Sequence, residues 1–371
     1  MEYWLGLFLV ELMLLGCYKN SHSEKGRHFV LFWIIFCLVY FSGFRDGLGM
    51  DYWAYKNLCE RSVYNDSVFW LSEPLFGGLQ TFCYHTQFSA VVLFLASALL
   101  TCTCCMWVYS KSNNFVLAAF VFIFYTGIYL YSMNIVAQFT SASIILLGYY
   151  NYMKEKNKKT LIVLLCSIFC GMLLHLSSVF MIIPIFFNTQ KLYMPLWVLF
   201  VILSLVIPME YIFRIPIIRK VIDILNYSNY IGYQTSGIKK LSMTNMYMHL
   251  MIMPFLFNYK SKIKNRKDAN EWIFLIKMFA MYLILNNLAT GQFTISYRLA
   301  VFYVVFIPLL FAKLPQIIDK QMAYVLIVLP LLILMSMRLM IGDKLTVPER
   351  ILPLNSILDK FYNPYQNPYV F

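Results

Sequence analysis

Residues 86–109, TQFSAVVLFLASALLTCTCCMWVY, decide the fold class, because this stretch is almost wholly apolar and contains no Asp, Glu, Lys or Arg. A run of about 20 apolar residues matches the length of an α-helix that crosses the hydrocarbon core of a bilayer. A helix also satisfies the hydrogen bonds of its own backbone, which lipid demands of any spanning segment. The stretch is therefore predicted to be a transmembrane helix.

The composition of the whole chain extends this prediction. Of 371 residues, 61% are hydrophobic and 13% are charged, and the mean hydropathy is +0.67. A soluble domain carries roughly 25% charged residues. Further apolar runs occupy residues 3–18, 28–43, 114–131, 133–151, 159–188, 193–209, 244–259, 271–290, 296–312 and 322–340. The first lacks a basic leader and a cleavage site, so we expect it to be retained. The sequence predicts an all-α polytopic protein in which residues 1–371 form a single integral membrane domain.

The basic residues predict how the chain is oriented in the membrane. The formal net charge is +13, and Lys and Arg concentrate in the short loops at residues 19–27, 154–159 and 260–267. Such loops are typical of the cytoplasmic side of a membrane protein. No nucleic-acid-binding motif accompanies the charges, so we expect no nucleic-acid partner.

One apolar run, residues 159–188, is too long for an ordinary span and carries His175, Ser177 and Ser178 at its middle. If the run were one helix, the basic loop at 260–267 would emerge outside. We therefore predict that it is split into two short helices near these polar residues. About twelve transmembrane helices result. Residues 44–85, 210–243 and 341–371 are then predicted to be long loops on the external side.

The densest set of polar groups follows the second apolar run, at Gly43-Phe44-Arg45-Asp46-Gly47-Leu48-Gly49-Met50-Asp51-Tyr52. The glycines let the backbone turn sharply and approach a ligand closely. Arg45 can pair with an oxyanion, and Asp51 can accept a proton. An ion pair that only fixes the loop is the alternative interpretation.

Two more polar pairs lie where apolar runs begin. Glu73 precedes Pro74, and a carboxylate at a helix start is favourable even without a function. Asn134 and Gln138 are four residues apart, so we predict that they share one helix face. The predicted topology places all of these groups near the external border.

His175 and Arg298 belong to the same predicted border. The simpler interpretations are a structural hydrogen bond for His175 and an interface anchor for Arg298. Arg214 and Arg219 alternate with isoleucines, a pattern suited to a helix that lies at the interface. Their charges are predicted to meet either an anionic diphosphate lipid or ordinary headgroups.

Taken in order, these motifs resemble the EpsG/Wzy-type polysaccharide (O-antigen) polymerases of bacteria. The matching pieces are residues 44–52, Glu73-Pro74, residues 134–138, residues 175–177, Arg298 and residues 367–369. The resemblance implies a glycosyltransferase of the bacterial inner membrane that joins undecaprenyl-diphosphate-linked oligosaccharide units on the periplasmic face. It also implies contact with membrane lipids and, as partners, a chain-length regulator and a flippase.

The resemblance gives each candidate residue an expected role. The diphosphate leaving group needs cations, and the acceptor hydroxyl needs a base. The predicted catalytic residues are Arg45, Asp51, Glu73, His175 and Arg298. The predicted substrate-binding residues are Asp46, Tyr52, Asn134, Gln138, Arg214, Arg219 and Tyr297. No Asp-x-Asp-like pair with supporting ligands stands out, so we expect no metal and no cofactor.

One position departs from the family pattern. The family commonly shows Asn-x-x-Arg-Gln, whereas this chain has Asn134-Ile135-Val136-Ala137-Gln138. Either the chain is an altered or inactive form, or Arg45 and Arg298 supply enough positive charge.

Two other functions fit parts of the sequence. An O-antigen ligase or a membrane acyltransferase would use similar external His and Arg residues. A flippase or transporter of lipid-linked sugars would place charges deep within its spans. We expected almost no Asp or Glu at mid-span, with Lys277 as the main exception and close enough to the border to reach water.

Overall fold

The structure is a computed structural model, and it describes residues 2–46, 51–60, 73–86, 90–125, 128–187, 192–206, 215–216, 220, 243–289, 295–341 and 355–356. The main α-helices are α1 (Glu2–Asn20), α2 (Glu24–Gly43), α3 (Tyr52–Glu60), α5 (Pro74–Thr86), α6 (Val91–Ser110), α7 (Phe115–Phe124), α8 (Tyr129–Ser132), α9 (Val136–Lys154), α10 (Lys158–Leu174), α11 (Met194–Val206), α14 (Met243–Asn258), α15 (Ala269–Leu288), α16 (Ile295–Val304), α17 (Ile307–Lys313) and α18 (Lys320–Ile341). Tighter or wider turns form η1 (Leu176–Phe186), η3 (Tyr259–Ile263) and η4 (Leu314–Gln316).

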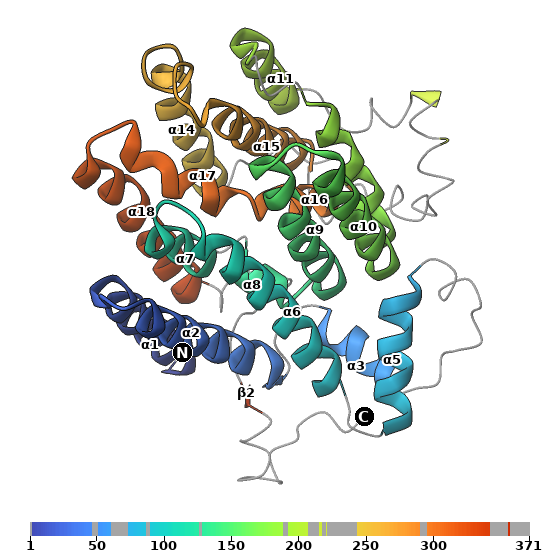
Figure 1. Cartoon of the computed structure of the whole chain (residues 1–371). Helices are drawn as coiled ribbons and strands as arrows, with labels where there is room; N and C mark the ends of the chain where they lie inside the picture. Colours follow the sequence, from blue (N-terminus) through green and yellow to red (C-terminus); the bar gives the residue numbers. More distant parts are fainter. Residues whose placement is uncertain are drawn as a thin grey trace.

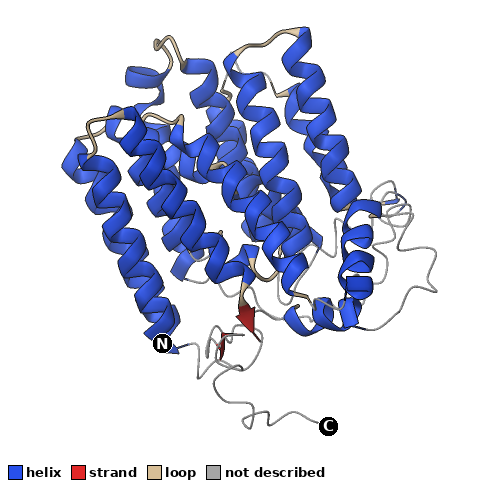
Figure 2. Ribbon diagram, turned by 60° about the horizontal axis from the view of Figure 1, so that its bottom comes forward, coloured by secondary structure: helices blue, strands red, loops and turns tan. Residues whose placement is uncertain are grey.

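The long helices pack side by side as a bundle (Figure 2). The strands β1 (Arg45–Asp46) and β2 (Asn355–Ser356) form one short antiparallel pair beside the bundle. Figure 1 places α3 and α5 together on one flank, and α11, α14 and α15 on another. The all-α prediction is confirmed, and the two short strands are its one exception among the described residues.

Four helices in the described part of the chain are long and apolar enough to cross a membrane, and they cover Glu24–Gly43, Val91–Ser110, Ala269–Leu288 and Arg298–Gln316. The last two are mostly buried, whereas Glu24–Gly43 exposes most of its surface. The bundle therefore has central helices and peripheral ones. The expected total of twelve spans is not confirmed, and the division of the chain into periplasmic loops stays a prediction.

The outer surface of the bundle is apolar. Exposed side chains include Phe32 and Phe36 on α2, and Met322, Val325 and Leu329 on α18. On α18 they recur at spacings of three and four residues, which places them on one helix face. A soluble protein would not expose so many large apolar side chains in rows, whereas lipid accepts them.

The break predicted inside residues 159–188 is present. Helix α10 ends at Leu174, His175 adopts an extended backbone, and the chain continues as the 3-10 helix η1. Ser178 donates to the His175 carbonyl at 2.6 Å, and Ser141 donates to the Gly171 carbonyl at 3.1 Å. Each of these carbonyls also accepts a backbone N–H, from Ser178 and from His175 respectively, so the hydroxyls add a second hydrogen bond at the break.

The three basic loops lie at one end of the bundle, which we call the basic end. The rings of Tyr18 and Phe115 pack 4.2 Å apart, and those of Trp107 and Tyr150 pack 6.1 Å apart. These pairs bring the ends of α1, α6 and α9 together. Lys154 then contacts Glu271 at 3.7 Å, next to the third loop. The prediction that these loops share one side is confirmed.

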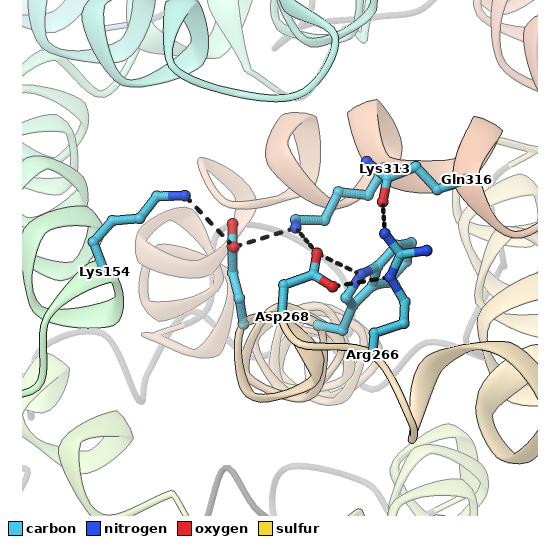
Figure 3. A network of polar contacts seen from close by, with 7 residues as sticks. Lys154, Arg266, Asp268, Lys313 and Gln316 are labelled. Atoms are coloured by element: carbon cyan, nitrogen blue, oxygen red, sulfur yellow. Dashed lines mark hydrogen bonds and ion pairs between the residues drawn. The ribbon is translucent and has the colours of Figure 1, made fainter.

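A network of ion pairs joins the helices at the basic end (Figure 3). Lys313 lies between Asp268 and Glu271, with its ammonium 2.9 and 3.2 Å from their oxygens. Arg266 pairs with Asp268 at 2.9 Å and donates to Gln316 at 2.7 Å. Burial raises the pKa of Asp268, but the hydrogen bonds from Arg266 and Lys313 outweigh it and lower the pKa to about 2. This network ties α15 to the segment after α17.

Candidate functional site

The site end of the bundle, opposite the basic end, begins with Arg45. Helix α2 ends at Gly43, where an added Cβ would meet the Leu95 side chain and lie 3.1 Å from the Leu95 backbone, so a larger residue would require Leu95 to move. This close approach to α6 brings Arg45 against that helix. Its guanidinium lies 4.0 Å from the centre of the Phe94 ring, and the side chain is only 1% exposed. Pairing of β1 with β2 holds the Arg45 backbone in register with Ser356.

Arg45 is a buried cation with unused hydrogen-bonding capacity. Its Nη1 donates to the Ser42 carbonyl at 2.7 Å and to the Ser42 hydroxyl at 3.2 Å. Its Nε and Nη2 are buried, and neither has a hydrogen-bond partner among the described residues. Burial lowers the pKa of Arg45 to about 10, and the nearby tyrosines counteract this shift. The group stays charged at neutral pH and offers the N–H groups of two nitrogens, Nε and Nη2, to an anion.

Glu73, His175 and Gln138 form a chain of contacts from three separate elements. Glu73 directly precedes Pro74, the first residue of α5, as predicted. Its Oε1 lies 2.5 Å from His175 Nδ1, and it accepts from the Leu176 backbone N–H at 3.4 Å. On the other side of the ring, His175 Nε2 lies 2.6 Å from Gln138 Nε2. With Nδ1 protonated toward Glu73, Nε2 accepts from the Gln138 amide, so both ring nitrogens are engaged.

Asp51 lies close to Asn134 and Arg298. The Asp51 backbone N–H donates to Asn134 Oδ1 at 3.1 Å. Burial raises the pKa of Asp51, and the positive charge of Arg298 partly offsets the rise. The carboxyl is therefore a stronger base than an exposed aspartate.

Tyr55 shows that these groups converge. Burial raises the pKa of Tyr55, and the charges of Asp51, Arg298, Glu73 and Arg45 each act on its hydroxyl. Those four side chains come from three parts of the sequence, since Arg45 and Asp51 share one segment. The structure thus brings two cations and two carboxylates to one end of the bundle, and Arg45 and Arg298 lie on the same side.

The structure places three of the predicted substrate-binding residues, Tyr52, Asn134 and Gln138, at the site end. Helix α9 begins at Val136, so Asn134 lies in the turn before it, and the expected shared helix face of Asn134 and Gln138 is wrong. Both residues still reach the site through Asp51 and His175. Tyr52 is buried and stacks on Phe94 with ring centres 5.3 Å apart.

The remaining predicted positions are described only in part or not at all. Asp46 lies in β1 and Tyr297 in α16, but their side chains are outside the described part of the structure. Arg214, Arg219 and residues 367–369 lie outside the described residues altogether. Their roles therefore stay predictions.

Two buried charges correct the expectation about mid-span residues. Glu11, in the first apolar run, is fully buried, and neither carboxylate oxygen has a hydrogen-bond partner among the described residues. The sequence analysis overlooked it. Lys277 does not reach water, because it is 4% exposed and lies 6.0 Å from the centre of the Trp197 ring. The scarcity of mid-span charge is thus a weaker argument against a transporter than it seemed from the sequence.

Comparison with known families decides the identity. The model of the EpsG family matches residues 28–356, which include every described site residue from Arg45 to Arg298. The chain belongs to the EpsG family. This is a family of Wzy-type polymerases, and membership indicates a polysaccharide polymerase-like function. No curated protein and no solved structure matches the chain significantly.

The EpsG-family assignment agrees with a membrane protein of polysaccharide biosynthesis, since the four apolar helices are long enough to span a bilayer. Ala137, the departure from the family pattern, is 5% exposed and packs in the same apolar cluster as Phe94 and Leu174. An arginine there would project from the first turn of α9, next to Gln138. In this EpsG-family protein, Arg45 and Arg298 are the cations that the described structure places near Asp51 and Glu73.

Proposed function

We propose that this EpsG-family protein is a polysaccharide polymerase that joins undecaprenyl-diphosphate-linked oligosaccharide units, of the O-antigen or exopolysaccharide kind. The observation that supports this most strongly is Arg45, a buried guanidinium with two nitrogens, Nε and Nη2, that lack hydrogen-bond partners among the described residues. Unpaired donors of this kind are costly to bury. A diphosphate oxygen is the ligand that would satisfy them best.

The proposed reaction transfers a glycan from one lipid to another. A hydroxyl oxygen of the acceptor sugar bonds to the anomeric carbon of the donor as the bond from that carbon to the diphosphate oxygen breaks. The bonding electrons leave with the diphosphate, and the charges of Arg45 and Arg298 stabilise it. The hydroxyl proton passes to a carboxylate of the site.

Asp51 is the better candidate for this base. Glu73 Oε1 already accepts from His175 and from the Leu176 backbone, so this carboxylate is committed to holding the imidazole. The raised pKa of Asp51 favours proton uptake during the reaction. We propose that Glu73 instead positions His175, which then contacts the leaving group or orients the donor.

The proposed orientation follows from the two ends of the bundle. Gln138 and Lys154 lie at opposite ends of α9, which separates the site from the basic end by about 24 Å at 1.5 Å per residue. If the basic end faces the cytoplasm of a bacterial inner membrane, the site faces the periplasm. A flippase would supply the lipid-linked unit, and a chain-length regulator would act at the same face. No group of three His, Cys, Asp or Glu in the described residues is placed to hold a metal ion, and metal independence stays a prediction.

The first experiment is the surface-polysaccharide banding pattern of a deletion strain that carries the wild-type or the Arg45→Ala gene. Arg45→Ala is expected to leave single capped units and no ladder, at a normal protein level. Arg27→Ala, an exposed arginine at the basic end, serves as the matched control and should restore the ladder. A wild-type ladder from Arg45→Ala would remove Arg45 from the site. Complete loss of capped core in the deletion strain would indicate a ligase or a flippase instead.

A further inference from the structure

A second group of buried polar side chains lies at the site end, away from Arg45. We call Ser204, His249 and Asn287 the amide–histidine cluster. Asn287 stands in the last turn of α15, His249 in the second turn of α14, and Ser204 near the end of α11. These helices lie together on the flank away from α3 and α5 (Figure 1). Because α15 starts in the ion-pair network of the basic end, its last turn belongs to the site end.

The hydrogen bonds of the cluster fix the orientation of the Asn287 amide. His249 Nδ1 lies 2.6 Å from the Asn245 carbonyl, which can only accept, so Nδ1 carries the proton and Nε2 is an acceptor. Ser204 donates its hydroxyl to the Val201 carbonyl at 2.7 Å, so its oxygen acts as the acceptor in the contact with Asn287. Asn287 Nδ2 lies 3.0 Å from His249 Nε2 and 3.0 Å from Ser204 Oγ. Both amide protons are therefore used within the cluster.

This orientation leaves one strong acceptor without a donor. Asn287 is 6% exposed, and its Oδ1 has no hydrogen-bond partner among the described residues. At the adjacent amide, Asn286 Nδ2 donates to Asn245 Oδ1 at 2.8 Å, and no side-chain atom of Asn286 is among the buried atoms that lack a partner in the described residues. If polar contacts served only to hold these helices together, the network would be complete at both positions. We therefore expect Asn287 Oδ1 to accept a hydrogen bond from a molecule that binds to the bundle.

The chemistry of the cluster selects a neutral hydroxyl over an anion. An amide oxygen accepts hydrogen bonds and repels a phosphate oxygen, and His249 presents an unprotonated nitrogen toward Asn287. A sugar hydroxyl donates one hydrogen bond and accepts others, which suits an amide held in a fixed orientation. His249 is only partly buried, so the cluster has an open side.

We propose that the amide–histidine cluster is a saccharide subsite in which Asn287 Oδ1 accepts a hydrogen bond from a sugar hydroxyl of a bound glycan. This proposal rests on the proposed function, since a polymerase must hold two lipid-linked glycans while one bond forms. Arg45 and Arg298 hold the diphosphate of the donor, and the cluster holds sugar units away from the reacting centre. Loss of the subsite weakens retention of the growing chain, so the polymer becomes shorter while single linkages still form.

Binding of a diphosphate-free glycan tests the subsite directly. The probe is the repeat-unit oligosaccharide released from the surface polysaccharide of the host strain, titrated into the purified full-length protein in detergent. The dissociation constant is expected to rise about tenfold or more in Asn287→Leu, because the site loses a hydrogen bond to a substrate hydroxyl. Asn286→Leu, the same change at the neighbouring paired amide, should bind within about twofold of wild type. Asn287→Ala gives the same readout with less bulk if the leucine variant does not accumulate.

Polymer length in the complemented deletion strain separates this proposal from the polymerase assignment. Asn287→Leu should shorten the ladder, with bonds still formed, whereas Arg45→Ala should abolish it. Wild-type affinity for the oligosaccharide and a wild-type ladder in Asn287→Leu would overturn the subsite and leave the polymerase intact. Equal losses in Asn286→Leu and Asn287→Leu, with equal drops in melting temperature, would also overturn it, because the cluster would then only join helices. Oligosaccharide binding lost in Asn287→Leu, together with complete loss of capped core in the deletion strain, would support the subsite and reject the proposed polymerase.

Discussion

The two ends of the bundle treat buried charge in opposite ways. At the basic end, Lys313 is 3% exposed and contacts two carboxylates within 3.2 Å. At the site end, Arg45 is 1% exposed, yet two of its guanidinium nitrogens have no partner among the described residues. A buried charge with a full set of partners connects structural elements, whereas one with spare donors remains ready for a ligand. The comparison therefore predicts that substitutions at the basic end affect stability and substitutions at the site end affect activity.

The largest effect is expected from Asp51→Asn, which removes the proposed base. The rate of linkage formation in membrane vesicles should fall about 1,000-fold, within the usual range for a general base. The matched control is Asp268→Asn at the basic end, which should keep the rate. If the rate of Asp51→Asn were within a few fold of wild type, a group other than Asp51 would be the general base.

The pH dependence sharpens the same prediction. Because burial raises the pKa of Asp51, the base is deprotonated only above that raised value. The acid limb of the rate profile should therefore lie above the ordinary carboxyl pKa of about 4. An acid limb at or below that value would show that the pH dependence of the rate does not report the ionisation of Asp51.

A smaller loss, about tenfold, is expected from Glu73→Gln, which keeps the shape of the side chain and removes its charge from His175. The informative measurement is a double-mutant cycle with His175→Gln. If Glu73 acts only through His175, the double variant should be no slower than His175→Gln alone. Additive losses would give Glu73 a separate role in the reaction.

At the basic end, Asp268→Asn should lower the free energy of unfolding by about 1–2 kcal/mol, after allowance for partial exposure. The pKa of Asp268 is lowered to about 2 in the folded protein. The ion pairs therefore contribute fully above about pH 4 and lose their contribution as the pH falls toward 2. The difference in the free energy of unfolding between wild type and Asp268→Asn, measured by thermal unfolding, should be smaller at pH 3 than at pH 7. An equal difference at both values would contradict the assignment to this carboxylate.

The smallest effect is a gain. Ala137→Arg restores the family arginine beside Gln138, and it should raise polymer formation by a few fold by adding positive charge near the proposed diphosphate. Ala137→Met tests the added bulk without the charge, since Ala137 is buried in an apolar cluster. Unchanged or lower activity of Ala137→Arg at a normal protein level would indicate that Arg45 and Arg298 suffice.

The sequence predicted features that depend on local chemistry or on counting spans. The common side of the basic loops followed from the clustering of Lys and Arg, and the break at His175 followed from parity and from polar residues inside an over-long run. The start of α9 was placed too early, because Asn134 and Ile135 continue an apolar run and carry no helix-stop signal. Phe94 could not be found, since no feature of an apolar helix marks which ring will face a guanidinium from another helix.

The amide–histidine cluster was missed for a related reason. Asn287 and His249 come from separate apolar runs, and each alone is an ordinary polar residue near a helix end. Only the packing of α11, α14 and α15 reveals that one amide oxygen is left without a donor. Glu11 was visible in the sequence and was overlooked.

The most direct test of the central claim is the binding of inorganic pyrophosphate to the purified full-length protein, measured by titration calorimetry. Wild type should bind, and Arg45→Ala should bind about tenfold or more weakly, because the buried guanidinium supplies charge-assisted hydrogen bonds to the anion. Arg27→Ala should match wild type. Equal affinity of Arg45→Ala and wild type would contradict the claim that Arg45 is held at the site end to receive a diphosphate.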